Sequence, residues 1–145
     1  MSMQIRSWEQ KDIPTLAEME RRCFSDPWTE QMLSDTLKLP VYHGFLAEED
    51  GVILGYASLI VVCEDAEVGN IAVDIPFRGK GISKLLMDAM LLRAKSLGAT
   101  HCFLEVRVSN TVAISLYEKY GYEKFGIRAK YYADGEDAFV MRKVL

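Results

Sequence analysis

Cysteine and histidine are scarce in this sequence of 145 residues, and each shortage argues against a class of protein. The three cysteines, Cys23, Cys63 and Cys102, form an odd and widely spaced set without a CxxC pair. Such a set argues against a disulfide framework and fits a reducing compartment. The two histidines, His43 and His101, are too few for a zinc or iron site of ordinary composition. We therefore expect no metal.

Long runs of one residue type are also missing. No block of Lys and Arg is longer than two residues and the formal net charge is -4, so a broad nucleic-acid-binding surface is not expected. No apolar run reaches the length of about 18 residues that a membrane span requires, and the N-terminus lacks an apolar segment of signal-peptide length. These absences predict a cytoplasmic protein without membrane or nucleic-acid partners.

The residues that are present suit one soluble globular domain. Hydrophobic residues make up 50% of the chain and charged residues 26%, a balance that supports a continuous core. We find no linker, repeat or low-complexity stretch. The expected domain spans residues 1–145.

Hydrophobic periodicity and turn residues predict the order β-α-α-β-β-β-α-β-α-β-β. Asp50-Gly51 is a hairpin turn between two of the strands, which indicates an antiparallel meander. In the helix that begins at Gly81, one apolar face is expected to contain Ile82, Leu85, Leu86, Ala89 and Leu92. The predicted strands are 4–8, 43–47, 52–62, 67–73, 101–108, 122–128 and 137–144. The predicted helices are 12–23, with Asp12 as cap, a short one from Thr29 that ends before Pro40, 81–97, and one that Asn110 caps and Gly121 ends.

The segment from Asn70 to Lys84 leaves a strand, turns and enters the N-terminus of a long helix. Such an N-terminus offers free backbone N–H groups and a dipole that favours negative charge. Gly79 and Gly81 allow the backbone to approach a ligand closely. The cations of the segment are Arg78, Lys80 and Lys84. Together these features predict a phosphate-binding site.

Two familiar nucleotide motifs do not fit this segment. A P-loop requires GxxxxGK[ST], which is absent here. The dinucleotide fingerprint requires a third glycine where Lys84 stands, together with a parallel βαβ unit. A different phosphate-bearing ligand is therefore expected.

An R-x-x-G-x-[GA] pattern after a hydrophobic strand, followed by N-x-x-A-x-x-L-Y-x-x-x-G-[FY], resembles the Gcn5-related N-acetyltransferases (GNAT). Residues Arg78 to Ser83 and Asn110 to Tyr122 carry the two patterns, with Ser83 where Gly or Ala is usual. The resemblance implies an α+β fold with a central, twisted, mixed but mostly antiparallel sheet of about seven strands and four helices. It also implies acetyl-CoA as the cosubstrate.

In that family the Gly-rich turn holds the pyrophosphate of CoA. The preceding strand pairs with the pantetheine arm, and one of its backbone N–H groups polarises the thioester carbonyl. Asn110 is expected to cap its helix and to contact the cofactor. By position, the cofactor-binding residues implied by the resemblance are Ile71, Ala72, Val73, Arg78, Gly79, Lys80, Gly81, Ile82, Ser83, Lys84 and Asn110.

Amide formation from a thioester requires a neutral amine, a polarised carbonyl and a proton for the leaving thiolate. The run from Leu104 to Asn110 resembles the LEVRxSN run of the RimI-type ribosomal-protein-alanine N-acetyltransferases, in which this Glu accepts the proton. Glu105 is thus the candidate base, and Arg107 is expected to hold its carboxylate ionised. Tyr117 is the candidate acid for the CoA thiolate. Each also has a structural interpretation, because strand carboxylates are often ion-paired and Tyr117 lies on the buried face of its helix.

Further matches to that subfamily occur along the chain at 24–30, 70–74, 128–132 and 135–138. They imply the N-terminal alanine of a small-subunit ribosomal protein as the acceptor. The loops that contain Pro27, Trp28, Tyr131 and Tyr132 are expected to flank the peptide groove, although such aromatic residues also commonly pack on the core.

We expect the amine to attack acetyl-CoA directly in a ternary complex, because no cysteine has a paired histidine. Two alternatives stay open. The chain could acetylate another amine, such as a lysine side chain or a small molecule, or it could be a non-catalytic CoA-binding or partner module. The sequence makes no prediction of oligomeric state.

Overall fold

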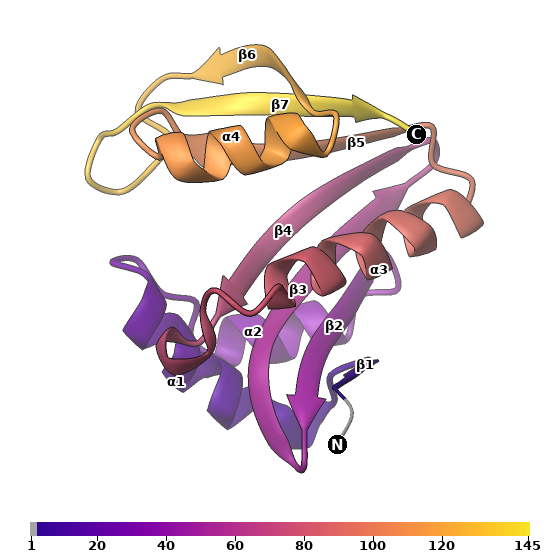
Figure 1. Cartoon of the computed structure of the whole chain (residues 1–145), viewed down its shortest axis with the longest axis vertical. Helices are drawn as coiled ribbons and strands as arrows, with labels where there is room; N and C mark the ends of the chain where they lie inside the picture. Colours follow the sequence, from indigo (N-terminus) through magenta and orange to yellow (C-terminus); the bar gives the residue numbers. More distant parts are fainter. Residues whose placement is uncertain (1–2) are drawn as a thin grey trace.

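The computed structural model describes residues 3–145, so the first two residues of the predicted domain lie outside the description. The predicted order of elements is confirmed (Figure 1). The strands are β1 (Gln4–Arg6), β2 (Tyr42–Glu49), β3 (Val52–Val62), β4 (Asp65–Val73), β5 (His101–Arg107), β6 (Glu123–Arg128) and β7 (Ala138–Val144). The helices are α1 (Ile13–Cys23), α2 (Glu30–Leu37), α3 (Ile82–Ser96) and α4 (Thr111–Lys119), with short 3-10 turns η1 (Gln10–Asp12) and η2 (Ile75–Phe77).

One seven-stranded sheet, in the order β1-β2-β3-β4-β5-β7-β6, organises the molecule. Its adjacent strands are antiparallel except β4 and β5, which are parallel, so the expected mixed and mostly antiparallel sheet is confirmed. The β2–β3 turn is the predicted one, with positive φ at both Asp50 and Gly51.

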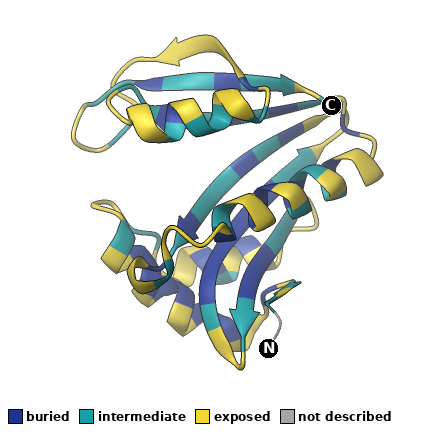
Figure 2. Ribbon diagram, viewed as in Figure 1, coloured by how far each residue is buried: buried dark blue, intermediate teal, exposed yellow. Residues whose placement is uncertain are grey.

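Two hydrophobic clusters stabilise the sheet through burial of apolar surface. The larger cluster joins α3 and α4 to the strands and includes Leu86, Met90, Leu104, Ile114 and Met141. The smaller cluster lies under α1 and α2 and includes Trp8, Leu16, Met19, Leu33 and Tyr56. Along β5 buried positions alternate with partly buried ones, whereas β3 has a run of buried residues at its centre and β6 is exposed along its length (Figure 2).

Local capping explains where several helices begin. The Asn110 side chain accepts the N–H of Ala113 at 3.2 Å, and Thr29 accepts that of Met32 at 3.2 Å, so these two predicted caps are confirmed. Asp12 does precede α1, but its carboxylate instead accepts the N–H of Glu9 and pairs with an arginine of β1.

The predicted apolar face of α3 is only partly correct. Ile82 and Leu86 are buried, but Leu85 and Leu92 are 41% and 72% exposed. Methionines at positions 87 and 90 are buried in their place. Compared with the prediction, the buried face of the helix is shifted around its axis toward these two methionines. Their unbranched side chains fill irregular space against the sheet.

Among residues 3–145, no helix combines the length and apolarity needed to cross a membrane. The same part of the chain holds no group of three His, Cys, Asp or Glu side chains that could bind a metal ion.

Candidate active site

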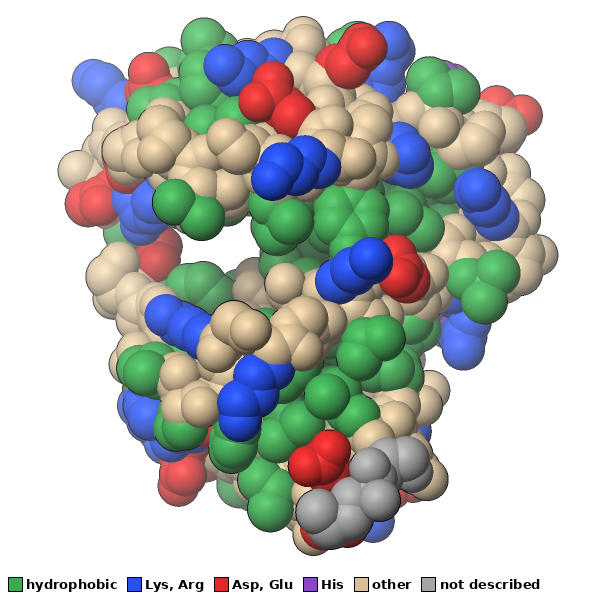
Figure 3. Space-filling view, in the orientation of Figure 1, with side chains coloured by type: hydrophobic (Ala, Val, Ile, Leu, Met, Phe, Trp, Pro, Cys, Tyr) green, Lys and Arg blue, Asp and Glu red, His purple; other side chains and the backbone are tan. Residues whose placement is uncertain are grey.

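The main pocket lies where β4 and β5 diverge. The two strands pair only over Asp65–Glu67 and His101–Phe103, and beyond these residues they separate (Figure 1). The space between them is a pocket of about 740 Å³ that both strands line, together with α4 and the loops 24–28 and 131–132. In the space-filling view a hollow opens between the two halves of the molecule on the left, while on the right the halves are in contact (Figure 3).

A β-bulge bends β4 at the pocket. Ser58 of β3 pairs with Asn70 and Leu59 pairs with Val68, so Gly69 is the extra residue. The Ser58 hydroxyl accepts the N–H of Asn70 at 3.1 Å. A Cβ atom at position 69 would lie 2.5 Å from that hydroxyl oxygen, which restricts the position to glycine.

The predicted phosphate segment begins α3 as expected. Gly81 is the N-cap of the helix with φ 78°, and Gly79 has φ 80°, values that favour glycine. The backbone N–H groups of Ile82, Ser83 and Lys84 occupy the first turn, where a helix has no acceptors of its own. Such a turn binds anions.

Arg78 has a different local role from the two lysines of this segment. Its guanidinium donates to the carbonyl oxygen of Val73 at 3.0 Å and to Sγ of Cys23 at 3.4 Å. The side chain therefore holds the turn against β4 and α1. Lys80 and Lys84 are exposed at the start of the helix.

A second pocket of about 200 Å³ leads from α3 toward the main pocket. Ile71 and Val73 of β4, Ser83 of α3 and several residues of α4 line it. The hydroxyl of Tyr120 is buried in this region without a hydrogen-bond partner among the described residues. The residues that line both pockets are Ile71, Asn110, Ala113 and Tyr117.

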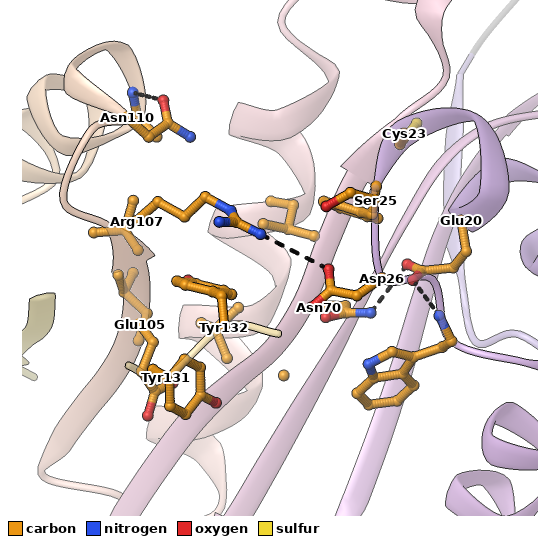
Figure 4. Close-up of a pocket in the computed structure, with 18 of the residues that line it drawn as sticks. Glu20, Cys23, Ser25, Asp26, Asn70, Glu105, Arg107, Asn110, Tyr131 and Tyr132 are labelled. Atoms are coloured by element: carbon orange, nitrogen blue, oxygen red, sulfur yellow. Dashed lines mark hydrogen bonds and ion pairs between the residues drawn. The ribbon is translucent and has the colours of Figure 1, made fainter. Parts of the chain in front are cut away.

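Glu105 lies on the wall of the main pocket formed by β5 (Figure 4). Its side chain is 10% exposed and lies 3.4 Å from Nε of Arg128. Burial, together with the charge and hydrogen bond of Glu67, raises the pKa of Glu105 to about 7, while Arg128 opposes the rise. A carboxylate with a pKa near neutrality is suited to accept a proton at physiological pH.

The expectation that Arg107 holds Glu105 ionised is wrong. Its guanidinium lies 2.8 Å from Asp134 and 2.9 Å from Glu136, and packs 4.0 Å from the centre of the Tyr132 ring. Arg107 is the last residue of β5, where the loop before β7 supplies these acidic partners. It lies two residues further along the strand than Glu105, so its guanidinium reaches the loop and not the carboxylate of Glu105. A longer contact of 3.9 Å reaches Asp26 across the pocket (Figure 4).

Tyr117 lies on α4 and lines both pockets. Its ring packs edge-on against Tyr122, with 6.0 Å between the ring centroids. Burial raises the pKa of Tyr117 above its ordinary value, so the phenol keeps its proton at neutral pH. A protonated hydroxyl at this position is a hydrogen-bond donor.

Three of the four residues predicted for the acceptor side line the main pocket, namely Trp28, Tyr131 and Tyr132. Pro27 is not among the lining residues, although its neighbour is. The rings of Tyr131 and Tyr132 pack edge-on at 5.0 Å. Of the predicted cofactor strand, Ile71 lines both pockets and Val73 the smaller one, whereas Ala72 is buried in the cluster under α1 and α2.

Sequence reasoning missed Glu20, a pocket-lining carboxylate that is only 1% exposed. It accepts the backbone N–H of Trp28 at 2.9 Å, the side-chain amide of Asn70 at 3.0 Å and the hydroxyl of Tyr56. Burial raises the pKa of Glu20, and these three donors oppose the rise. A signal was available, because Glu20 continues the spacing of the buried Ile13, Leu16 and Ala17 along α1.

Comparisons with known proteins agree with this geometry. The model of the "Acetyltransferase (GNAT) family" matches residues 13–122. The chain is 34% identical to the "[Ribosomal protein bS18]-alanine N-acetyltransferase" of Escherichia coli (strain K12), over 94% of each chain. It is 33% identical to the "N-alpha-acetyltransferase RimI" of Mycobacterium tuberculosis (strain H37Rv), over 91% of this chain and 86% of the relative.

A solved structure extends the likeness to three dimensions. The crystal structure of the ribosomal-protein-S18-alanine N-acetyltransferase from Escherichia coli superimposes with a TM-score of 0.91 at 32% identity. The match covers 99% of this chain and 94% of that chain. On the sequence match, the shared fold and the pocket between β4 and β5, the chain belongs to the acetyltransferase (GNAT) family.

Proposed function

We propose that this protein is an Nα-acetyltransferase that moves the acetyl group of acetyl-CoA to the N-terminal alanine of ribosomal protein bS18. The names of its relatives support the acceptor. The observation that carries the chemistry is the pairing, in one pocket, of Glu105, whose pKa is raised to about 7, with the protonated phenol of Tyr117.

Acetyl-CoA fits the side of the molecule that carries α3 and α4. The first turn of α3 supplies N–H groups for the pyrophosphate, and Lys80 and Lys84 supply positive charge. The pantetheine arm would follow the smaller pocket, where the hydroxyl of Ser83 and that of Tyr120, which has no hydrogen-bond partner within residues 3–145, are available to its amides. Asn110 stands where the two pockets meet.

The acceptor peptide fits the opposite entrance, between loop 24–28 and the aromatic pair Tyr131 and Tyr132. Carboxylates of Glu20, Asp26 and Glu105 line this space, an arrangement that attracts a protonated N-terminus. The amine and the thioester then meet beside Ile71, whose strand is bent by the adjacent bulge.

Reaction follows by direct attack in a ternary complex. The amine nitrogen forms a bond to the thioester carbon, Glu105 takes the proton of that nitrogen, and the C–S bond breaks. Tyr117 donates a hydrogen bond or a proton to the leaving thiolate. Because an ordinary phenol is already about 2 kcal/mol too weak an acid for full transfer to a thiolate, and burial weakens it further, hydrogen-bond donation is the larger part of this role.

An α-amine suits a carboxylate base of this strength. With a pKa of about 7.7–8.0, roughly a tenth of an N-terminal amine is neutral at pH 7, against less than about a thousandth of a lysine amine near 10.4. An N-terminal amine therefore needs less deprotonation by the base than a lysine side chain does.

The test is acetylation of a peptide that begins with alanine, measured beside the same peptide with a blocked N-terminus and an internal lysine. Glu105→Gln should lower kcat by about 10²-fold or more, the usual contribution of a general base, and Tyr117→Phe should lower it less. Calorimetry should find acetyl-CoA binding nearly unchanged in both. Glu123→Gln, on the exposed strand β6, is the matched control.

Full activity in both variants would refute the assigned roles. Acetylation of the lysine in the blocked peptide at a similar rate would refute the N-terminal specificity. Acetyl-CoA binding without acetylation of either peptide would favour a non-catalytic module.

A further inference from the structure

Glu67 and Glu105 face each other at the point where β4 and β5 separate. Glu67 is the last residue of β4 paired with β5, and its partner is Phe103. Paired residues of parallel strands project to the same face, and Glu105, two residues beyond Phe103, projects to that face as well. The two carboxyl groups therefore lie on one face of the sheet, at neighbouring positions of adjacent strands.

The groups around this pair supply little positive charge. From β6, Arg128 lies 3.4 Å from Glu105, but the arginine side chain is mostly exposed. From the loop before β7, the phenols of Tyr131 and Tyr132 face the pair, and negative charge on Glu105 and Glu67 adds to burial in raising the pKa of Tyr131. From β7, the residue opposite Glu105 is the uncharged Val140, while Arg142, opposite Phe103, places its guanidinium 4.3 Å from the centre of the Phe125 ring.

We propose that Glu67 is a positioning residue that shares with Glu105 the proton taken from the acceptor amine, so that the base of this enzyme is a carboxyl pair. The proposal rests on the role of Glu105 proposed above. It assigns to Glu67 a task in the reaction, although Glu67 is not among the residues that line the pocket.

The proton balance of the pair is simple. The form of the pair that accepts the proton carries two negative charges, which repel each other. When the amine nitrogen attacks the thioester carbon, its proton moves to Glu105 and is then held in the hydrogen bond between Glu105 and Glu67. The pair changes from two negative charges to one, which relieves the repulsion. After product release, water takes the proton.

This arrangement makes Glu105 a stronger base than an isolated carboxylate. Like charge disfavours the ionised form, and a hydrogen bond between the two carboxyl groups favours the form with one proton. Activity should therefore rise with pH through a value near 7, where the second proton leaves the pair.

The experiment compares pH profiles of kcat/KM for the wild-type enzyme and Glu67→Gln, each divided by its own plateau. The glutamine removes the like charge, so the midpoint that belongs to Glu105 should move down by about one pH unit. The normalised activity at pH 6 should then rise about five-fold, because the ionised fraction increases from about a tenth to about a half. Titration of the peptide amine cancels in the ratio of the two profiles.

The absolute plateau should fall in the same variant, since a weaker base accepts the proton less readily. Arg128→Met, which removes the exposed cation, should move the midpoint up. Glu67→Ala provides a second way to remove the charge if the glutamine variant is unstable, and thermal denaturation reports the folding of each variant.

An unchanged midpoint, an upward shift in Glu67→Gln, or an equal loss of activity at every pH would overturn the carboxyl pair. The role of Glu105 is tested separately by Glu105→Gln. If that variant is fully active, the proposed function fails, whereas loss of activity there with an unchanged profile in Glu67→Gln refutes only the pair.

Discussion

At the scale of single residues, Glu20 is the least expected feature of the pocket. A buried carboxylate usually has a cationic partner, but the three donors to Glu20 are a backbone N–H, a phenol and an amide. They come from the loop at Trp28, from Tyr56 of β3 and from Asn70 of β4. Glu20 therefore fixes the loop of the acceptor side against the floor of the pocket.

We predict that Glu20→Gln weakens the acceptor side selectively. The side-chain amide of glutamine has only one acceptor oxygen, and its NH₂ group would point at groups that are themselves hydrogen-bond donors. The loop at Trp28 would therefore be held less firmly, and the KM for the alanine peptide should rise about ten-fold. The affinity for acetyl-CoA, measured by calorimetry, should change by less than about two-fold, because the proposed cofactor path lies on the opposite side of the pocket. The matched control is Glu18→Gln, an exposed position on the same helix that should behave as wild type. An unchanged peptide KM in Glu20→Gln would contradict the role.

At the scale of elements, the bulge in β4 decides the shape of the site. An extra residue in one strand bends that strand and increases its twist. Here the bend begins at Gly69, two residues after Glu67, which is the last residue of β4 that still pairs with β5. The bulge thus coincides with the divergence of the two strands and turns Asn70 and Ile71 toward the pocket.

Gly69→Ala is expected to destabilise the protein by about 1–3 kcal/mol, because the new Cβ atom overlaps the hydroxyl of the buried Ser58. Urea denaturation of Gly69→Ala, Ser58→Ala and the double variant measures the overlap directly. The double variant should be more stable than the sum of the single effects predicts, since removal of the hydroxyl relieves the overlap. Gly126→Ala, at a strand position with no atom near the new Cβ, is the control. Strict additivity would show that the hydroxyl is not the obstacle.

At the scale of the whole molecule, β4 and β5 join the two halves through only a short stretch of pairing. The larger hydrophobic cluster crosses this junction, because Leu86 and Met90 of α3 belong to the same cluster as Leu104 of β5 and Met141 of β7. Packing in this cluster therefore adds to the strand pairing of β4 and β5 in holding the two halves together.

This arrangement predicts a single unfolding unit. Met141→Ala in the C-terminal half should lower stability by about 2–5 kcal/mol. The loss should also appear in the fluorescence of Trp8 and Trp28, which both lie in the N-terminal half. Val144→Ala, at a 67% exposed position of the same strand, should change the unfolding midpoint little. Separate transitions by fluorescence and by circular dichroism would show instead that the halves unfold independently.

The sequence by itself determined the order of elements, the caps at Thr29 and Asn110 and the glycine turn that begins α3, because periodicity, caps and glycine turns act over a few neighbouring residues. Only the tertiary structure decided which charged groups meet. Glu20 and Tyr56 are 36 residues apart, and Arg107 and Glu136 are 29 apart. Sheet register and the divergence of β4 from β5 bring such residues together or, as with Arg107 and Glu105, keep them apart. Pairing at that distance depends on the path of the whole chain, which no local pattern encodes.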